Sequence, residues 1–493
     1  MRAKLFKYLN SSKDYPVLAA LAAGLYPLGH YYYNNFTFIN SWNHFGFFLL
    51  VFIVAPIIVF YGIHRISKHI TILNRYKKYV IPILNLSSFA LLIVISTYGF
   101  KKKLMVLVLL IAIGLAILLH KQFKKLIVIQ MIMAIMVIAS FVPTLYSYFN
   151  HNQDWLKQAD TIDSVVFKKQ PNIYLIQPDG YANFTELKNK TYDFDNAEFE
   201  YYLAKNKFKI YNNFRSNYYS TLSSNASLFT MKHHYYSSFK KSSNEVFKAR
   251  EIIVGDNPVL SIFKNNNYKT HFIAETPYLI ANKPEVMYDY SNIDVDEVPF
   301  FSKGFDYNRD VIDDLKTAFT KEFKSSNNFY FIQKILPGHV STYKNQSKGK
   351  TKEREIYIER LGWANTWLED IIAEINEHDP NGLVIILADH GGFVGYDYTR
   401  ASNIKQENRD LIYSIFSTAL AIKWPEDVSK FDVDLKTNVN VFRVLFSYLG
   451  NETKYLESLE KDLSFKPITE GAPFGIYELI NENGDIVFEN FSN

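Results

Sequence analysis

Hydrophobic and polar positions divide the chain into two parts with different patterns. Residues 1–150 contain five apolar stretches, each free of charged side chains over roughly 17 to 22 residues. A helix of that length crosses a bilayer core of about 30 Å, and a single cleaved signal peptide would leave four stretches unexplained. We therefore predict five transmembrane helices, over residues 15–33, 45–63, 79–99, 104–120 and 126–146.

The remainder of the chain alternates short apolar runs with amphipathic segments, a pattern typical of an α/β domain over residues 171–493. Residues 151–170 are polar and mixed in charge, which predicts a partly helical linker. The predicted strands are 172–177, 208–212, 269–274, 328–335, 383–387 and 418–423. The predicted helices are 196–205, 221–233, 257–264, 308–323, 352–376 and 438–449. Residues 474–488 predict a small C-terminal β element, two strands around the Asn483-Gly484 turn.

Charge is distributed unevenly between the two parts. Residues 1–150 hold 15 of the 54 Lys and Arg residues and one acid, Asp14, so they carry +14, whereas the remainder carries −9. The overall +5 is an average and gives no argument for nucleic-acid binding. The apolar stretches contain almost no ionisable side chain, His30 being the nearest case, so we interpret them as an anchor rather than a transport path.

The positions of Lys and Arg in the short loops predict the orientation in the membrane. With the amino terminus inside the cell, the cytoplasmic segments hold twelve Lys and Arg and the outer loops hold three, Lys101 to Lys103. That triplet could instead mark a tight or re-entrant hairpin. Five spans place everything after about residue 150 outside, so we expect a multi-pass protein of the cell (inner) membrane with an extracytoplasmic domain.

Two of the predicted strands end in side chains that bind metal ions. Asp389 and His390 follow the run 383–387, and Asp179 follows the run 172–177. Ligands bind at the carboxyl ends of strands in open α/β sheets, so these three side chains could share one cation. Their oxygen and nitrogen atoms suit Mn, Mg or Zn, and the lack of a clear second His-Asp set favours one ion over two. An ordinary strand-end turn, above all at Asp179-Gly180, would have the same pattern.

The segment 215–234 predicts a helix that begins near Thr221, Ser223 or Ser224. A hydroxyl group there lies beside free backbone N–H groups, which suits an anionic phosphoryl group. A cation that also contacts this hydroxyl would activate it as a nucleophile. From this segment alone, a capping threonine without chemistry is the better interpretation.

Three further histidines complete the candidate chemistry. His339 follows the strand 328–335 in a Pro-Gly-His sequence, and it could bind a phosphate oxygen or protonate a leaving group. A loop histidine that is merely solvated is the alternative. We expect His233 and His234 to face the domain surface, outside the metal group.

Together these motifs resemble the alkaline phosphatase and sulfatase superfamily, and within it the membrane-anchored branch similar to lipoteichoic acid synthases. Asp179 matches the first metal-ligand strand, where the synthases usually have Glu, and Asp389-His390-Gly391 matches the second ligand pair. The sulfatase nucleophile motif places Thr221 on the nucleophile, and Ser224, Leu228 and Thr230 on its conserved positions. The resemblance implies an alkaline-phosphatase-like α/β/α sandwich, with Thr221 as both nucleophile and metal ligand and His339 facing the substrate.

The chain also departs from the sulfatase motif, which has Pro and Arg where this sequence has Ser223 and Asn225. Sulfatases oxidise a Cys or Ser to formylglycine, and threonine cannot form that aldehyde. Threonine here is similar to the phosphoglycerol and phosphoethanolamine transferases, which form a phospho-threonine. The resemblance therefore favours a phosphate ester over a sulfate ester as the substrate.

These observations predict a metal-dependent enzyme that transfers a phosphoglycerol or phosphoethanolamine group from a phospholipid to an envelope glycan or lipid. A phosphodiesterase or other sulfatase-like hydrolase would use the same residues and release the group to water. An inactive envelope scaffold or sensor is the third alternative. The chain has no cysteine, which excludes disulfides, thiolate metal sites and a cysteine nucleophile.

Overall fold

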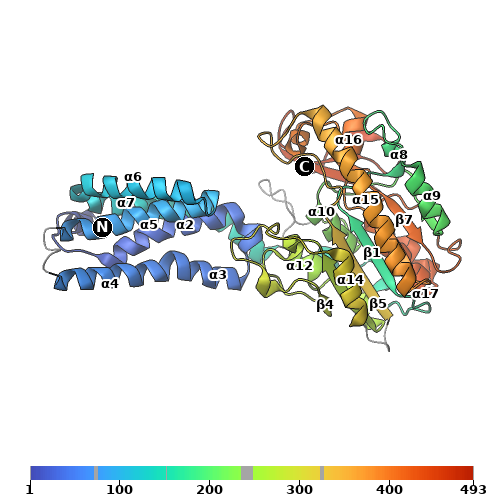
Figure 1. Ribbon diagram of the computed structural model, residues 1–493, viewed down its shortest axis with the longest axis horizontal. Helices are drawn as coiled ribbons and strands as arrows, with labels where there is room; N and C mark the ends of the chain where they lie inside the picture. The colour runs from blue at the N-terminus through green and yellow to red at the C-terminus, as the bar shows by residue number, and fades with distance from the viewer. Residues whose placement is uncertain (1, 71–75, 152, 235–247, 322–326, 492–493) are drawn as a thin grey trace. The chain divides into compact units, whose positions relative to one another are not determined.

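A computed structural model describes residues 2–491, apart from 71–75, 152, 235–247 and 322–326 (Figure 1). The chain forms two compact units, one of residues 1–150 and 299–303 and the other of residues 151–298 and 304–493. Arg75, which contributes to the predicted orientation, and the last two residues of the helix predicted over 308–323 lie outside the described residues.

The first unit is helical, and each of the five predicted apolar stretches falls on helical segments. Among the described residues, three segments are by length and composition able to cross a membrane: Trp42–His69, Lys77–Tyr98 and His120–Asn150. The first of them is interrupted by a π-helical stretch, η1, and α6 is only 17 residues long, so the count of five spans stays a prediction. The helices are α1 (Arg2–Leu9), α2 (Pro16–Ile39), α3 (Trp42–Leu49), η1 (Leu50–Val54), α4 (Ala55–His69), α5 (Lys77–Tyr98), α6 (Lys102–Leu118) and α7 (Phe123–Asn150).

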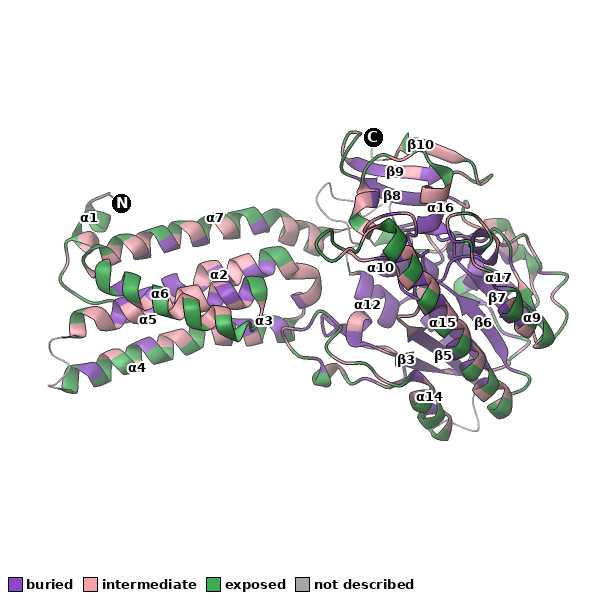
Figure 2. Cartoon of the chain, turned by 45° about the horizontal axis from the view of Figure 1, so that its top comes forward, coloured by how far each residue is buried: buried purple, intermediate pink, exposed green. Residues whose placement is uncertain are grey.

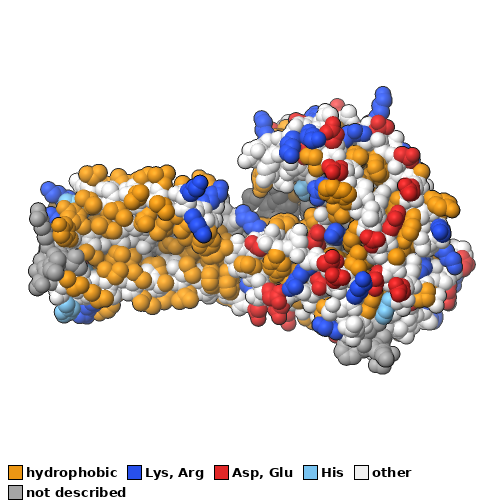
Figure 3. All heavy atoms as spheres, viewed as in Figure 1, with side chains coloured by type: hydrophobic (Ala, Val, Ile, Leu, Met, Phe, Trp, Pro, Cys, Tyr) orange, Lys and Arg blue, Asp and Glu red, His pale blue; other side chains and the backbone are white. Residues whose placement is uncertain are grey.

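Two buried amide side chains inside the first unit are paired with each other, while much of the surface of the unit is apolar. Asn85 and Gln130 exchange two hydrogen bonds of 2.9 and 3.0 Å, and Asn85 also donates to the carbonyl of Ala19. Figure 3 shows hydrophobic side chains over much of the visible surface of α2 to α7, whereas acidic and basic side chains are interspersed over the second unit. This distribution fits a unit whose surroundings are apolar.

The second unit is built around a seven-stranded mixed sheet with the strand order β2-β7-β6-β1-β5-β3-β4. β1 lies between β6 and β5 and is parallel to both, and β7 pairs with β6 antiparallel. All six predicted strands of the domain are confirmed, and the two-residue β4 was missed. The strands are β1 (Ile173–Pro178), β2 (Phe208–Ile210), β3 (Tyr268–Ala274), β4 (Tyr290–Ser291), β5 (Asn327–Lys334), β6 (Leu383–Leu387) and β7 (Leu420–Lys423).

Helices cover both faces of this sheet, because its central strands are apolar on both sides. Alternate residues of β1 enter two different cores: Ile173 and Leu175 face one, and Tyr174 and Ile176 face the other. Figure 2 shows the strands buried between helical layers. The first core contains residues of α10 (Thr221–Thr230), α12 (Ala249–Val254), α13 (Pro258–Asn265) and α17 (Val441–Gly450). The second contains residues of α8 (Phe184–Leu187), α9 (Ala197–Lys205), α14 (Val311–Thr320) and α15 (Lys350–His378).

Three smaller features complete the second unit. The predicted C-terminal β element exists as β9 (Gly475–Ile480) and β10 (Ile486–Asn490), and β8 (Ser464–Ile468), which was not predicted, extends it to three antiparallel strands. α16 spans Arg409–Phe416. Within the predicted linker, Ile162, Val165 and Phe167 are buried in the core of the second unit.

A buried pair of amides connects β1 to α10. Gln177 and Asn225 donate to each other's carbonyl oxygens at 2.8 Å in both directions, and neither side chain is exposed. Gln177 lies two residues before Asp179, and Asn225 lies one turn after Thr221. The pair therefore fixes the first turn of α10 against the carboxyl end of β1.

We expect Asn225→Leu to lower the free energy of unfolding of the full chain by about 1–3 kcal/mol, because the amide of Gln177 would stay buried without its partner. Thermal unfolding in detergent, followed by tryptophan fluorescence, measures the change. The matched control is the double variant Gln177→Leu/Asn225→Leu, which removes both partners and should recover part of the loss. A single variant as stable as the wild type would contradict this account of the pair.

Candidate metal and phosphoryl-transfer site

Four of the five predicted site residues follow three adjacent parallel strands. Asp179 directly follows β1, Asp389 and His390 follow β6, and His339 follows the loop after β5. Because β6, β1 and β5 are neighbours and run in the same direction, their carboxyl ends lie at one edge of the sheet. The structure thus brings together side chains that are up to 211 positions apart in the sequence.

Asp179, Asp389 and His390 form a compact group of possible metal ligands. One ligand atom from each lies within 4.8 Å of the others. His390 Nε2 is 3.6 Å from Asp179 Oδ1 and 3.5 Å from Asp389 Oδ2. All three residues are buried, and Asp179 Oδ1 and Asp389 Oδ2 accept no hydrogen bond from any described residue. Buried carboxylate oxygens without donors are costly unless a cation binds them, so this set fits one divalent ion.

The electrostatics of the group also favour a bound cation. Burial, followed by the nearby Asp389 carboxylate, raises the pKa of Asp179 to about 7. Burial alone would lower the pKa of His390, but Asp389 and Asp179 raise it above its usual value. Two carboxylates side by side in the protein interior repel each other. A cation between them would remove that repulsion.

Hydrogen bonds from the surrounding backbone orient the group. Asp389 Oδ1 accepts from the amides of Gly180, at 3.1 Å, and of His390, at 3.0 Å, which leaves Oδ2 available. His390 Nδ1 is 2.9 Å from the carbonyl oxygen of Gly391, which can only accept. Nδ1 therefore carries hydrogen, and in the neutral ring the lone pair on Nε2 faces the carboxylates, as a metal ligand requires.

Thr221 lies beside this group at the amino terminus of α10. Its Oγ1 is 3.4 Å from His390 Nε2, and the residue is 7% exposed, enough for contact with a bound group. α10 begins at Thr221 as predicted, and the N-cap residue, Ser220, makes no side-chain cap hydrogen bond. The first backbone N–H groups of the helix are not bonded by a capping side chain, which suits an anion. α10 ends at Thr230, three residues earlier than predicted, because Met231 adopts a left-handed conformation.

His339 lies next to His390. Their ring centroids are 5.8 Å apart, and both rings contact Phe393. His339 Nδ1 is 2.6 Å from the carbonyl oxygen of Val340, so Nδ1 carries hydrogen. Burial and the neighbouring His390 lower the pKa of His339 to about 4, so the ring is neutral near pH 7 and presents Nε2 as an acceptor.

Sequence reasoning missed the side chains that hold the strand-end loops together. Tyr357, on α15, donates from Oη to the carbonyl of Gly180 and accepts from the amide of Ala182, at 2.9 and 3.1 Å. A Cβ at position 392 would lie 2.2 Å from the Tyr357 ring, so only glycine fits at this position without a shift of the ring. Asn438 donates to the carbonyl of Ala388, at 3.2 Å. These residues lie on helical segments without a motif, so one sequence gives no signal for them.

The expectation that His233 and His234 face the surface is wrong, because both side chains are buried. His234 stacks on Tyr218 with ring centroids 4.0 Å apart, and its Nε2 lies 3.0 Å from the carbonyl of Ser223. Tyr218 Oη lies 3.0 Å from His233 Nδ1. The two histidines thus help to pack the segment around α10, and the ligand group contains neither of them.

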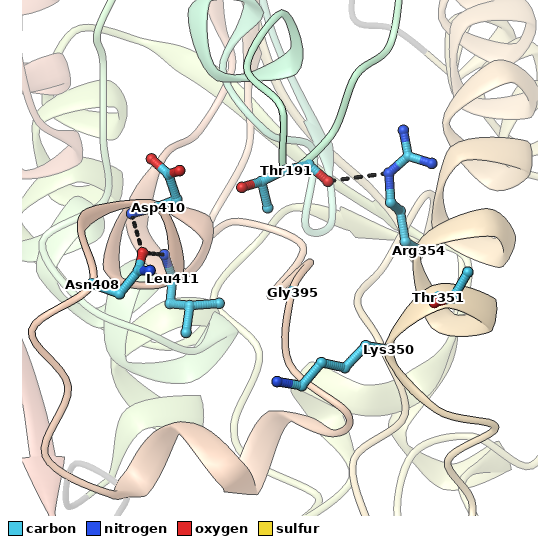
Figure 4. A pocket seen from close by; sticks show the side chains of 8 residues that line it. All are labelled: Thr191, Lys350, Thr351, Arg354, Gly395, Asn408, Asp410 and Leu411. Carbon is cyan, nitrogen blue, oxygen red and sulfur yellow. Dashed lines mark hydrogen bonds between the residues drawn. The ribbon is translucent and has the colours of Figure 1, made fainter.

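An open pocket of about 340 Å³ lies elsewhere in the second unit (Figure 4). One wall comes from the first turns of α15, where Arg354 donates to the carbonyl of Thr191 at 3.1 Å. None of the predicted site residues lines it. Its lining residues are Thr191, Lys350, Thr351, Arg354, Gly395, Asn408, Asp410 and Leu411.

Comparisons with known proteins give matches among solved structures only. No protein-family model and no curated protein matches the chain. Phosphoethanolamine transferase A (EptA) from Neisseria meningitidis matches with a TM-score of 0.42 and 10% identity, over 89% of this chain and 96% of that chain. The periplasmic domain of EcEptC from Escherichia coli in complex with Zn matches with a TM-score of 0.42 and 13% identity, over 65% and 96%.

The lipoteichoic acid synthase LtaP from Listeria monocytogenes matches with a TM-score of 0.40 and 13% identity, over 66% of this chain and 90% of that chain. Likenesses of this size carry no argument about the activity of this chain. Phosphoethanolamine transferases, a lipoteichoic acid synthase and sulfatases are among the matched solved structures, and these are the kinds of protein that the sequence motifs resemble.

Proposed function

We propose that the chain is a membrane-anchored, metal-dependent phosphotransferase that removes a phospho-alcohol head group from a phospholipid through a phospho-threonine at Thr221. One observation carries this proposal. The hydroxyl of Thr221 lies 3.4 Å from His390, beside two buried carboxylates whose free oxygens have no donor among the described residues. A hydroxyl, a cation-binding group and the amino terminus of a helix at one point are the parts that phosphoryl transfer requires.

Asp179, Asp389 and His390 would hold the cation, with Thr221 Oγ1 as a further ligand. A divalent ion bound there lowers the pKa of a hydroxyl group and neutralises charge on phosphoryl oxygens. Mn, Mg and Zn all suit these ligands, and one ion accounts for the described group.

Two displacements at phosphorus follow from this arrangement. In the first, Thr221 Oγ1 loses its proton and forms a bond to phosphorus, the bond from phosphorus to the diacylglycerol oxygen breaks, and that oxygen takes up a proton. In the second, an acceptor hydroxyl attacks the phospho-threonine, and Thr221 leaves and recovers its proton. His339, neutral and with Nε2 free to accept, suits removal of the proton from the incoming hydroxyl. An envelope glycan or lipid as acceptor gives a transferase, and water gives a hydrolase.

The first unit would anchor this site at the outer face of the cell membrane, where the lipid substrate is. The apolar surface of the first unit supports a multi-pass anchor with five spans. So does the charge of +14 on residues 1–150, because every charged side chain there lies outside the five predicted spans. The diacylglycerol product would then remain in the bilayer.

Thr221→Ala should abolish head-group release, by at least about 10³-fold in kcat, because the covalent intermediate cannot form. The assay incubates the full-length protein with phosphatidylglycerol or phosphatidylethanolamine labelled in the head group and measures diacylglycerol. Thr221→Ser, which keeps a hydroxyl group, is the matched control and should retain activity and a covalent label. Label on another residue, or turnover by the Ala variant, would refute the mechanism. Label appearing on glycan or lipid rather than on free alcohol identifies a transferase.

Asp389→Asn should weaken Mn²⁺ binding, because one anionic ligand of the cation is lost. Loss of a residue that only hydrogen-bonds to a metal ligand weakens binding by roughly 10–100-fold, so we expect a larger effect here. Calorimetric titration of the chelator-treated protein measures this affinity without turnover. Asp397→Asn, a change at a nearby acid outside the ligand group, serves as the control. Equal Mn²⁺ affinity in all three proteins would exclude the site.

The orientation can be tested directly because the chain contains no cysteine. Single cysteines introduced as Asn43→Cys and Asn483→Cys should react in intact cells with a maleimide that cannot cross membranes. Lys78→Cys should react only after the cells are opened, since it lies in a predicted cytoplasmic loop. All three positions are exposed in the structure. Labelling of Lys78→Cys in intact cells would invert the proposed topology.

A further inference from the structure

A guanidinium group lies next to the site and forms no ion pair with any described residue. Arg360 is on α15, one turn after Tyr357, the residue that holds the Gly180 loop. A Cβ placed on Gly338 would lie 2.7 Å from Arg360 Nη2 and 3.4 Å from Nη1. The guanidinium therefore packs directly on the backbone of Gly338.

That backbone is part of the site. The amide of Gly338 donates to the carbonyl of Asp179 at 2.8 Å, and the next residue is His339. Arg360 is thus placed beside the point where the strand-end loops of β1 and β5 meet. Burial has the largest effect on the pKa of Asp179 and of His339, and the positive charge of Arg360 lowers both values.

Other cations around this edge of the sheet already have partners. Lys334 pairs with Glu275 at 3.2 Å, and Arg409 pairs with Glu186. Arg354, six residues earlier on α15, donates to backbone carbonyls of Thr191 and Tyr192. Arg360 is half-buried and makes no hydrogen bond or ion pair with any part of the chain that the structure describes.

We propose that Arg360 binds a non-bridging oxygen of the phosphoryl group that Thr221 attacks. This inference rests on the proposed function and specifies how its substrate is bound. The two carboxylates balance the charge of one divalent ion, so Arg360 supplies the excess positive charge that an anionic phosphodiester needs. A guanidinium offers parallel N–H donors that match two phosphoryl oxygens, and its charge-assisted hydrogen bonds strengthen as negative charge collects on those oxygens.

The arrangement also gives Gly338 a specific role. Its φ is +71°, and any side chain there would displace the Arg360 guanidinium. The glycine in the Pro-Gly-His sequence thus keeps room for the arginine next to His339.

Binding of sn-glycerol 1-phosphate to the Mn²⁺-loaded full-length protein, measured by calorimetry, tests the proposal without turnover. Arg360→Gln should weaken this binding by about 10- to 100-fold, as the loss of a charge-assisted hydrogen bond does. Arg360→Lys should fall between, because an ammonium group cannot make the two parallel bonds. Arg354→Gln, a change one and a half turns earlier on α15, is the matched control and should bind like the wild type. Mn²⁺ affinity should be the same in every variant.

Each result decides the matter. Unchanged affinity for glycerol phosphate in Arg360→Gln overturns the proposal, and so does a wild-type protein that binds Mn²⁺ but no glycerol phosphate. A parallel loss of Mn²⁺ affinity in Arg360→Gln would show a structural role and overturn it as well. If glycerol phosphate binding depends on Arg360 but the protein never forms phospho-Thr221, the role of Arg360 in binding is supported and the proposed function is rejected. If phospho-Thr221 forms but glycerol phosphate binding does not depend on Arg360, only the proposed role of Arg360 is rejected.

Discussion

Two buried carboxylates that face the same histidine are the constraint around which the second unit is arranged. Asp179 and Asp389 would repel each other in a protein interior, and neither has hydrogen-bond donors for all its oxygens among the described residues. Much of the surrounding structure holds them in this arrangement. The amide of Gly180 donates to Asp389, the carbonyl of Gly391 orients His390, and the hydroxyl of Tyr357 fixes the Gly180 loop. Such a group stores unfavourable electrostatic energy that a cation releases, which is why we interpret it as a binding site and not as part of the core.

The parallel strands make this arrangement possible. β1 has β6 on one side and β5 on the other, both parallel to it, so three loops leave the sheet at one edge. Both faces of β1 are covered by helices, and a continuous apolar run is needed to fill them. The same apolar run that makes the strand recognisable in the sequence therefore also places the polar residue after it at the functional edge.

The six main strands, and the candidate ligands that follow them, could be predicted from the sequence for this reason. The third C-terminal strand and the side chains that pack around the site could not. Apolar runs with turn residues after them identified six strands. The hydroxyl-rich segment placed the start of α10 near Thr221, Ser223 or Ser224, and the resemblance to the sulfatase motif singled out Thr221. β8 was missed because its five residues include Lys466 and Pro467 and so show no clear alternation, although both are buried. His233 and His234 were misplaced because their burial depends on Tyr218, which packs against them only in the folded chain. Tyr357 and Arg360 lie on a helix that was predicted correctly, but which face of that helix meets the site depends on tertiary packing.

Asn225 shows how the motif and the packing depend on each other. The sulfatase motif that this segment resembles has an arginine at this position, and here the shorter amide is turned toward Gln177 and fully buried. A cation in that place would have no acidic partner, since the amide of Gln177 occupies the contact. Positive charge for a phosphoryl group must then come from another element, and α15 presents Arg360 on the other side of the same strand ends. Asparagine at the position of the motif's arginine, and a guanidinium on α15 with no ion pair among the described residues, are both consistent with the proposed role of Arg360.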